Sequence, residues 1–363
     1  MIKEFLINKI KSSPNQCMDY AAFMETVLYD SQDGYYSKAQ KKIGKQGDFY
    51  TSISVNPIFS RVVSRALIKM IIDENLPRVL CEIGAGEGKF AEVFLNEWER
   101  VCQDDFCYYA VEKSAYHQSL QYKHLGERVK YYNNVSELIK HHPSFEGIIF
   151  SNELFDAFPV HVVQQSKNQL YEVFVTVNDE GKLIERNQPC ENQLILQWIE
   201  KYGFPLADKQ RLEIPLQMTA YIKMLASWMK RGIIVTIDYG YTNEEWQHPA
   251  RRNGSLRGYY RHQMIENPLL YLGEMDLTTH IYLDGLQKIG EDYGLIHIKT
   301  MSQTSFLLAS GILEELEEHQ DRNPFSETNR KNRAIRTLIT QGDLSSYFHV
   351  IVQGKQIQHH NWK

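Results

Sequence analysis

The chain has 363 residues, 43% of them hydrophobic, which is enough for one large domain with insertions or for two domains. Its formal net charge of −5 argues against a nucleic-acid partner, and its five cysteines include no C-x-x-C pair, so they predict free thiols and no metal site. No apolar stretch approaches the ~20 residues that a membrane span needs, and residues 1–14 lack the pattern of a signal peptide. We therefore expect a cytoplasmic protein without a membrane span.

Residues 1–75 are expected to form a helical N-terminal unit. Two short amphipathic helices fit residues 1–30, and a turn with aromatic residues follows at Tyr29 to Tyr36. Residues 43–54 show no period and predict a loop. Asn56-Pro57 is typical of a helix start, because Asn caps a helix and Pro suits its first position. We expect this unit to cover the mouth of the glycine-rich turn described below.

From residue 79 onward, short apolar runs alternate with helical patterns. The expected strands are 79–83, 107–111, 129–132 and 147–151, and the expected helices between them include 87–101 and 114–124. Continuous apolar runs of this length suit strands that are buried on both faces of a sheet. The pattern therefore predicts parallel strands joined by right-handed helical crossovers.

The alternation breaks after the fourth strand. Residues 160–210 predict an insertion, a β-hairpin plus a helix. A helix over Leu216 to Met229 is expected to end with Lys230, Arg231 and Gly232. A strand at 233–237, a long loop at 241–275 and a helix capped by Asp276 that runs to about Ile289 are expected to follow. The remaining predictions are a strand at 295–299, helical residues at 311–341 and a strand at 348–352. Together these elements predict an α/β fold with a seven-stranded, mostly parallel sheet in residues 76–159 and 211–363.

A glycine-rich turn, Glu82-Ile83-Gly84-Ala85-Gly86-Glu87-Gly88, joins the first strand to its helix. Such a turn directs backbone N–H groups and the positive end of a helix at a ligand. A phosphate loop is excluded because Phe90 follows Lys89. A dinucleotide fingerprint is disfavoured because Gly84 and Gly86 fit it but Lys89 stands at the third glycine position. The spacing E-x-G-x-G-x-G is similar to motif I of S-adenosylmethionine (SAM) methyltransferases. We therefore predict that Glu82, Gly84, Ala85 and Gly86 bind SAM. The alternative is a plain strand–helix turn with incidental glycines.

Polar residues also follow the next strands, at the carboxyl edge where open parallel sheets bind ligands. Glu112, after the second strand, is expected to accept hydrogen bonds from both ribose hydroxyls; the alternative is a solvated acid that Lys113 neutralises. Asn134 and Val135, after the third strand, are expected at the adenine edge, although Asn is common in any turn. The predicted cofactor contacts at these strand ends are Glu112, Lys113, Asn134, Val135 and Asn152.

The stretch Asn152-Glu153-Leu154-Phe155-Asp156-Ala157-Phe158-Pro159 comes directly after the fourth strand. Methyl transfer needs the acceptor held close and aligned, and a nitrogen acceptor also needs carboxylates that orient it and receive its proton. Glu153 and Asp156 are therefore predicted to be catalytic; the alternative is that they are acids at a helix N-terminus. His280 is a third catalytic candidate, expected in the first turn of the helix that Asp276 caps.

Several segments together resemble the MidA-type SAM-dependent methyltransferases, whose mitochondrial members assist the assembly of respiratory complex I. The matching segments run in family order over residues ~20–310. They are Asp33-Gly34-Tyr35-Tyr36, Gly47-Asp48-Phe49-Tyr50-Thr51-Ser52, Glu82 to Gly88, Val111-Glu112-Lys113-Ser114, Asn152 to Pro159, Ile237-Asp238-Tyr239-Gly240 and Gly273-Glu274-Met275-Asp276-Leu277-Thr278-Thr279-His280. Asn152 to Pro159 and Asp276 to His280 are the most specific.

The resemblance implies a class I, Rossmann-like fold, SAM as methyl donor and, as in the mitochondrial members, a protein arginine as acceptor. It also implies that the Gly47–Ser52 loop closes over SAM, which makes Tyr50 and Thr51 predicted cofactor contacts. Two positions depart from the family pattern: Ile53 stands where Pro is frequent, and Thr279 where Ala is common. Neither departure removes a polar side chain.

Three functions follow from these observations. The first is methyl transfer to a protein arginine, favoured by the Glu153 and Asp156 pair because carboxylates match a planar, cationic guanidinium. The second is methyl transfer to a small molecule or to another protein side chain. The third is a SAM-binding assembly factor with little catalysis. A nicotinamide-linked oxidoreductase is disfavoured by Lys89.

Overall fold

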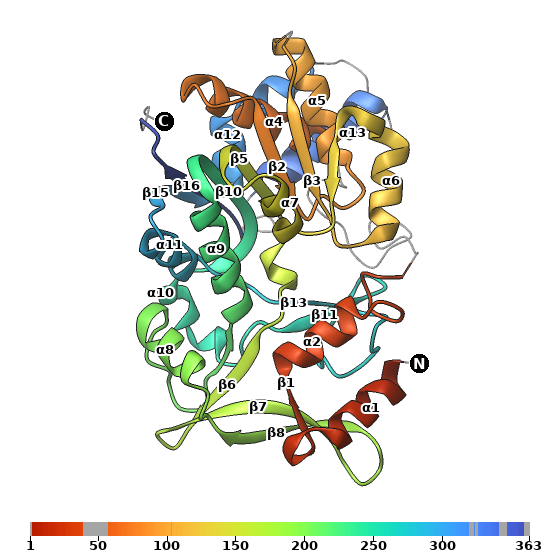
Figure 1. Ribbon diagram of the computed structural model, residues 1–363, viewed down its shortest axis with the longest axis vertical. Helices are drawn as coiled ribbons and strands as arrows, with labels where there is room; N and C mark the ends of the chain where they lie inside the picture. Colours follow the sequence, from red (N-terminus) through yellow and green to blue (C-terminus); the bar gives the residue numbers. More distant parts are fainter. Residues whose placement is uncertain are drawn as a thin grey trace. The chain divides into compact units, whose positions relative to one another are not determined.

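The main sheet carries the glycine-rich turn at one of its strand ends (Figure 1). The structure, a computed structural model, describes residues 2–38, 57–102, 104–318, 323, 326–340 and 347–358. Seven strands follow one another in the order β15-β16-β10-β5-β2-β3-β4, and β14 pairs with the end of β10. Their bounds are β2 Val79–Ile83, β3 Cys107–Val111, β4 Lys130–Tyr132, β5 Phe145–Asn152, β10 Met229–Tyr241, β14 Ile281–Tyr282, β15 Ile296–Ser302 and β16 Phe348–Lys355.

The sheet is mostly parallel, as predicted. Strands β4, β3, β2, β5 and β10 pair in parallel, whereas β16 runs antiparallel to both β10 and β15. Strand β2 has β3 on one side and β5 on the other, because the chain runs outward from β2 through β3 to β4 and then returns to the opposite side of β2 as β5. Ligands of open α/β sheets bind at such a switch point, outside the carboxyl ends of the strands. Here that place belongs to the ends of β2 and β5.

Contacts between Cα atoms divide the chain into two units. One consists of residues 1–49, 155–224 and 240–292, and the other of residues 50–154, 225–239 and 293–363. We call the latter the sheet unit and the former the insertion unit. This grouping differs from the three predicted domains, because the helix α4 (Pro57–Asp73) belongs with the sheet and residues 240–292 belong with the β-hairpin region.

The helices of the sheet unit bury one apolar face each. In α5 (Lys89–Val101), Phe90, Phe94 and Trp98 recur every four residues and are buried. Phe90 packs against Phe150 of β5, with ring centroids 4.4 Å apart. The other helices of this unit are α4, α6 Ala115–Leu125, α7 Val135–His141, α12 Gln303–Ala309 and α13 Glu327–Ile339, while α9 Leu216–Trp228 crosses from the insertion unit.

The described residues of the insertion unit form two antiparallel sheets. The larger has the order β1-β7-β6-β9, with β8 paired to β7, and the smaller has the order β12-β11-β13. Its core includes Leu6 and Phe23 from the N-terminal helices and Val162 and Val175 from the larger sheet. The elements are α1 Ile2–Ser12, β1 Cys17–Asp19, α2 Tyr20–Tyr29, β6 His161–Ser166, β7 Gln169–Val177, β8 Leu183–Pro189, α8 Gln193–Tyr202, β9 Arg211–Ile214, α10 Asn243–Trp246, β11 Arg257–Tyr260, β12 Gln263–Ile265, β13 Asp276–Thr278 and α11 Leu283–Asp292.

Three local predictions from the sequence are wrong. Residues 241–275 are not a structureless loop, because β11 and β12 form a hairpin there and β11 pairs with β13. Asp276 lies in β13 and does not cap a helix, since the helix begins only at Leu283. The predicted helix from Leu216 is confirmed as α9, which ends at Trp228, but Gly232 does not cap it. Gly232 lies within β10 opposite Gly147, whose carbonyl oxygen would be 2.0 Å from any β-carbon at position 232.

Candidate functional site

Three glycines of the turn after β2 have backbone angles in the left-handed region. The φ angles of Gly84, Gly86 and Gly88 are +75°, +52° and +80°. A β-carbon on Gly84 would come within 3.0 Å of Leu154, and one on Gly88 within 3.0 Å of Gln121 and Leu125. A β-carbon on Gly86 would meet nothing within 4 Å. Gly84 and Gly88 are thus close-packed against protein, whereas the space beside Gly86 is open to a ligand.

Glu112 fastens the glycine turn to the end of β3. Its Oε2 accepts a hydrogen bond from the Gly86 N–H at 2.9 Å, and its Oε1 accepts one from the Ser114 N–H at 2.8 Å. The Gly84 N–H also donates to the Val111 carbonyl at 2.9 Å. Gly86, which follows β2, and Glu112, which follows β3, are therefore in direct contact.

Glu82 ends its strand inside the protein, with an exposed fraction of 3%. The Tyr108 hydroxyl donates to Glu82 Oε2 at 2.7 Å. Burial raises the pKa of Glu82 to about 8, the Tyr108 hydrogen bond opposes that rise, and the negative charge of Glu112 adds to it. A cationic group close to Glu82, such as the ammonium of an amino acid, would favour the ionised carboxylate.

The remaining predicted cofactor residues of the sheet unit differ in their surroundings. Lys113 is exposed. Asn134 caps α7, because its side chain accepts a hydrogen bond from the Glu137 N–H at 2.9 Å, while Val135 is buried. The side chain of Asn134 therefore acts as a helix N-cap in the structure. Tyr50 and Thr51 lie outside the described residues.

Glu153 follows β5 in a backbone conformation that is rare for a residue with a side chain. Its φ is +49°, and its N–H donates to the Ile237 carbonyl of β10 at 2.9 Å. Asn152 Nδ2 donates to Glu153 Oε1 at 3.1 Å, and Asn152 Oδ1 is buried with no hydrogen-bond partner in the described part of the chain. Strained backbone of this kind concentrates at functional sites.

Glu153 belongs to the sheet unit and Asp156 to the insertion unit, so the contacts of Asp156 are described separately. Asp156 is buried in a short 3-10 helix, Phe155–Ala157, and its carbonyl accepts the Thr279 N–H at 2.8 Å. Tyr36 of the same unit donates to Asp276 Oδ1 at 2.8 Å. The negative charges of Asp276 and Asp156 help to raise the pKa of Tyr36, after burial, which is the main cause.

His280 lies between β13 and β14 and not in a helix, which corrects its predicted setting. Its ring stacks on Tyr241 with centroids 4.5 Å apart, and Arg257 Nη2 lies 2.7 Å from Nδ1. The same Nη2 lies 3.2 Å from Nε2, and because a guanidinium can only donate, a ring nitrogen without a proton must accept this hydrogen bond. Burial lowers the pKa of His280, and the charges of Arg257 and Arg251 lower it further. His280 is therefore a neutral, tightly packed imidazole.

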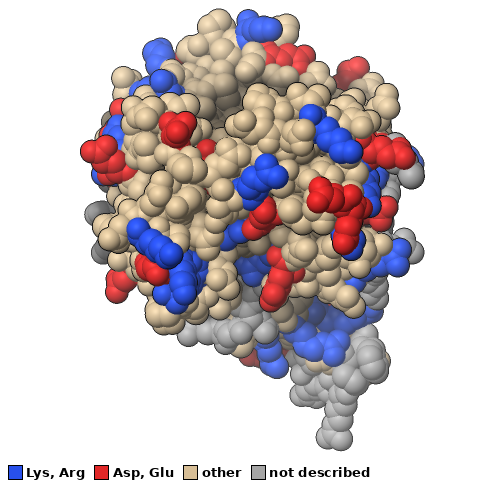
Figure 2. Space-filling model, turned by 90° about the horizontal axis from the view of Figure 1, so that it is seen from below, with Lys and Arg blue, Asp and Glu red and all other residues tan. Residues whose placement is uncertain are grey.

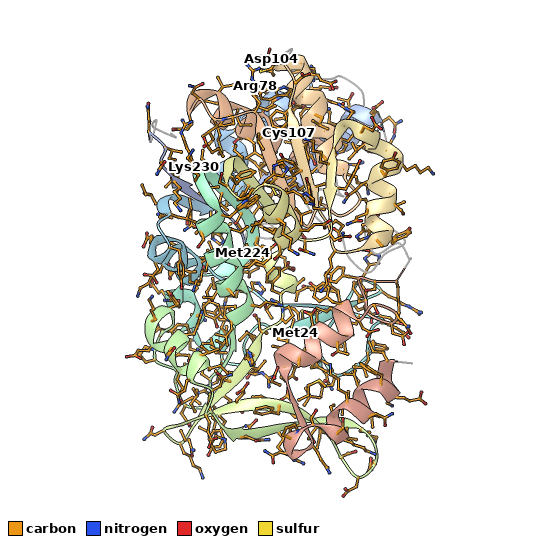
Figure 3. All side chains as sticks on the ribbon, in the orientation of Figure 1. Met24, Arg78, Asp104, Cys107, Met224 and Lys230 are labelled. Carbon is orange, nitrogen blue, oxygen red and sulfur yellow. The ribbon has the colours of Figure 1, made fainter. Side chains whose placement is uncertain are left out.

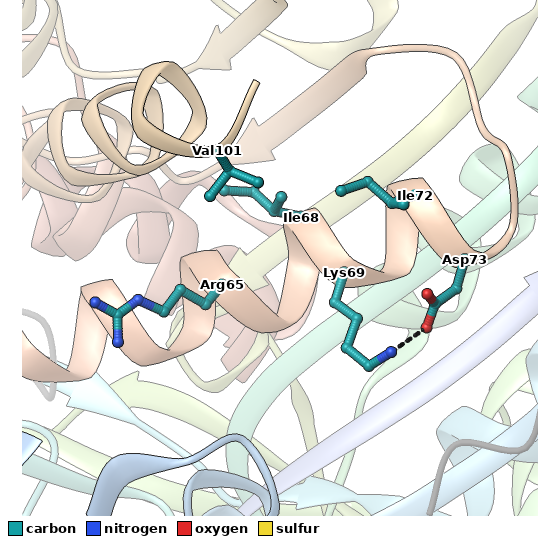
Figure 4. A pocket seen from close by; sticks show the side chains of 6 residues that line it. All are labelled: Arg65, Ile68, Lys69, Ile72, Asp73 and Val101. Carbon is teal, nitrogen blue, oxygen red and sulfur yellow. Dashed lines mark hydrogen bonds and ion pairs between the residues drawn. The ribbon is translucent and has the colours of Figure 1, made fainter. Parts of the chain in front are cut away.

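The amino ends of β2 and β3 lie opposite the glycine turn and have different features. Arg78, which precedes β2, and Asp104, which precedes β3, form an ion pair at 2.5 Å near Cys107 (Figure 3). On the same side, a shallow hollow is lined by Ile68, Ile72 and Val101, with the Lys69–Asp73 ion pair at its rim (Figure 4). Because α4 and α5 lead from here into the amino ends of β2 and β3, this hollow is separate from the glycine turn.

Within the described residues, the glycine turn differs from the surface charge and from the features that a metal ion or a membrane would need. No group of three His, Cys, Asp or Glu residues within it could hold a metal ion, and none of its helices is long and apolar enough to cross a membrane. On the face drawn in Figure 2, basic side chains are interspersed with acidic ones and form no broad basic stripe among the described residues. The glycine turn with Glu82 and Glu112, by contrast, offers an open cradle, buried acids and oriented backbone groups, a set that fits SAM.

Two residues of the glycine-turn site escaped sequence reasoning. Tyr108, inside β3, reads as an ordinary strand residue, yet it hydrogen-bonds Glu82. Gln121, inside α6, donates from Nε2 to the Gly86 carbonyl at 2.6 Å. Neither residue lies in a recognisable motif. For Gln121, the one weak signal is a polar residue on the inward face of α6.

The curated relatives are 22% to 26% identical to this chain over the aligned residues. The mitochondrial protein arginine methyltransferase NDUFAF7 homolog of Drosophila melanogaster is 26% identical over 315 residues, which are 76% of this chain and 67% of the relative. The mitochondrial NDUFAF7 of Danio rerio is 24% identical, over 80% of this chain and 72% of the relative. These names point to mitochondria, so the prediction of a cytoplasmic protein is wrong by this comparison.

Two crystal structures from Burkholderia thailandensis share the fold. One, described as a methyl transfer enzyme candidate and solved with bound S-adenosyl-homocysteine, has a TM-score of 0.87 and 25% identity, and it covers 98% of this chain and 93% of its own. The second, a native structure, has a TM-score of 0.85 and 24% identity over the same shares. This likeness confirms the class I methyltransferase-like α/β fold.

A family model also matches this chain. Its description is "Putative S-adenosyl-L-methionine-dependent methyltransferase", and it matches residues 63–300. That range contains the glycine turn, Glu112 and the stretch after β5, and it covers more than half of the chain. The chain belongs to this family of S-adenosylmethionine-dependent methyltransferases.

Proposed function

We propose that this protein transfers a methyl group from SAM to a nitrogen of an arginine in a protein. The observation that carries the proposal is that the relatives named protein arginine methyltransferases align with 76% to 87% of this chain, as in the Drosophila melanogaster and Caenorhabditis elegans proteins. The alignment therefore extends well beyond the cofactor turn, into the regions that would recognise the acceptor.

We assign cofactor binding to the carboxyl ends of β2, β3 and β5. Gly84, Ala85 and Gly86 would lie along the methionine moiety, Glu82 near its ammonium group and Glu112 at the ribose. Asn152 supports the assignment, because its buried Oδ1 has no partner among described residues and is free to accept a hydrogen bond from a ligand. Lys113, Asn134, Val135, Tyr50 and Thr51 remain predicted contacts.

The chemistry asks little of the chain beyond positioning. Bound SAM supplies an electrophilic methyl group on a positively charged sulfur; the acceptor nitrogen takes that methyl and loses a proton, and S-adenosylhomocysteine is left. The chain must align the nitrogen and receive the proton. A carboxylate does both for a guanidinium, because it accepts the N–H hydrogen bonds in the plane of the group.

Glu153 is the residue we assign to this task. Its left-handed backbone, tied to β10 through its N–H and to Asn152 through its carboxylate, is costly for a non-glycine residue and marks a side chain with an enforced direction. Asp156, from the same segment, is proposed to assist, and His280 in its neutral state is a further candidate.

The proposal is tested by the identity of the methylated residue. Tritiated-methyl SAM is incubated with the protein and a lysate from cells that lack it, and the labelled protein is hydrolysed to amino acids. We expect tritium in methylarginine. Label in another amino acid or in a small molecule would identify a different acceptor and contradict the proposal. Cofactor binding without any transfer would favour a SAM-binding assembly factor instead.

A further inference from the structure

Gln121 places a polar amide against the glycine turn from inside the protein. Its side chain belongs to α6 and has an exposed fraction of 0%. Its Nε2 donates to the Gly86 carbonyl at 2.6 Å, and a β-carbon on Gly88 would come within 3.0 Å of its Cγ. The helix therefore contacts the turn through this residue at close range.

The hydrogen bond determines which way one peptide group faces. A peptide unit is planar and trans, so its C=O and N–H point in opposite directions. With the Gly86 carbonyl directed at α6, the Glu87 N–H must point away from that helix. The Gly86 N–H is held separately by Glu112. Both backbone polar groups of Gly86 are thus fixed by side chains of different elements, next to the open space beside this glycine.

The amide of Gln121 has an energetic cost that packing alone does not explain. Its Oε1 is buried and has no hydrogen-bond partner in the described part of the chain. Leucine or methionine at this place would fill the same interior without a buried unsatisfied oxygen. We propose that Gln121 is a positioning residue, which holds the Gly86 peptide in the orientation that binds SAM. This inference rests on the assignment of SAM to the glycine turn.

Substitution of Gln121 by methionine tests the proposal, because methionine keeps the length of the side chain and removes the donor. Calorimetric titration with S-adenosylhomocysteine should show about tenfold weaker binding for Gln121→Met. The KM for SAM should rise by a similar factor, while kcat at saturating SAM stays within about threefold. Hydrogen exchange of residues 83–90 without ligand should be faster. Lys123→Met, an exposed change in the same helix, should match the parent in each respect.

Gln121→Glu adds a readout that a packing role would not move. A protonated carboxyl can still donate to the Gly86 carbonyl, whereas an ionised one would repel it. The ratio of variant to parent affinity should therefore be close to one at low pH and fall as pH rises through the pKa of the new carboxyl. Affinity equal to the parent for both variants at every pH, with Gly86→Val still unable to bind, would overturn the role of Gln121. Unchanged binding by Gly86→Val would instead contradict the assignment of SAM to the glycine turn.

Discussion

At the scale of single residues, substitutions at Gly86 and Gly126 distinguish the effect of backbone strain from the effect of filling the space that SAM would occupy. Gly86 and Gly126 have nearly equal φ angles, +52° and +53°, and neither has an atom within 4 Å of its missing β-carbon. A valine at either place is strained, because both φ angles are positive; at Gly126 the ψ angle of −131° adds to that strain, so Gly126→Val is a control for backbone strain. Only position 86 adjoins the proposed cofactor.

We predict that Gly86→Val abolishes SAM binding and that Gly126→Val retains it. The branched side chain would occupy the space of the methionine moiety in the first variant and open solvent-side space in the second. Isothermal titration with SAM, together with circular dichroism to verify folding, measures both. Equal affinity of the two variants would show that the open side of Gly86 is not the cofactor site.

Glu82 gives a pH dependence of known sign. Its pKa is raised from 4.5 to about 8, so the folded protein holds a proton that the unfolded chain releases between these values. The contribution to stability is complete below pH 4.5 and is lost as pH rises through about 8. Chemical denaturation of the cofactor-free protein at several pH values should show this decline in the free energy of unfolding. The decline should be smaller in Glu82→Gln, and an identical pH profile in the two proteins would contradict the assignment.

At the scale of elements, the glycine turn depends on its link to the end of β3. Glu112 accepts hydrogen bonds from Gly86 and Ser114 and would also bind the ribose. We predict that Glu112→Ala weakens SAM binding about tenfold or more, because removal of charge-assisted hydrogen bonds costs about 1.5–3 kcal/mol. Ser136→Ala, at an exposed position of α7, is the control. A loss below threefold in the titration would leave Glu112 as a solvated strand-end acid.

The elements of the sheet were predictable where burial on both faces leaves an unambiguous pattern. The bounds of β2 and β3 agree with the predicted strands because their apolar runs are short and continuous. The hairpin of β11 and β12 was missed, since Arg257-Gly258-Tyr259-Tyr260 alternates weakly and mixes polar with aromatic residues. The sequence predicts a helix cap at Asp276 because Asp is a frequent capping residue. In the fold, Asp276 instead pairs with Tyr259 of a distant strand, and local sequence does not indicate that pairing.

The candidate site was predictable to the extent that its residues sit in one motif or at a strand end. The turn residues and Glu112 meet as expected because parallel strands share one carboxyl edge. The partners Tyr108 and Gln121 were not predictable, since a buried hydrogen bond between distant residues leaves no local spacing. The neutral state of His280 likewise depends on Arg257, 23 residues away in sequence.

At the scale of the whole molecule, the two units divide the predicted residues. The described cofactor contacts and Glu153 belong to the sheet unit, and Asp156 and His280 to the insertion unit. If Glu153 and Asp156 act on the acceptor, their removal should affect turnover and leave cofactor binding nearly intact. This separation distinguishes a catalytic carboxylate from one that holds SAM.

We predict that Glu153→Gln and Asp156→Asn each lower methyl transfer about a hundredfold or more, the usual scale for the loss of a positioned acid–base or electrostatic group. SAM affinity should stay within a few-fold, because neither change touches the glycine turn. Tritium transfer into protein gives the rate and calorimetry gives the affinity. Transfer at the parent rate by both variants would place the acceptor elsewhere, with His280 and Arg257 the next residues to test.

The central claim, methylation of a protein arginine, is tested most directly by peptide mass spectrometry of whole proteomes. Host cells that lack the protein are compared with the same cells that express the parent, Gly86→Val or Gly126→Val at equal levels. We expect at least one arginine-containing peptide that carries an added methyl group with the parent and with Gly126→Val, and that is unmethylated without the protein or with Gly86→Val. The same set of methylated arginines in all four proteomes would contradict it.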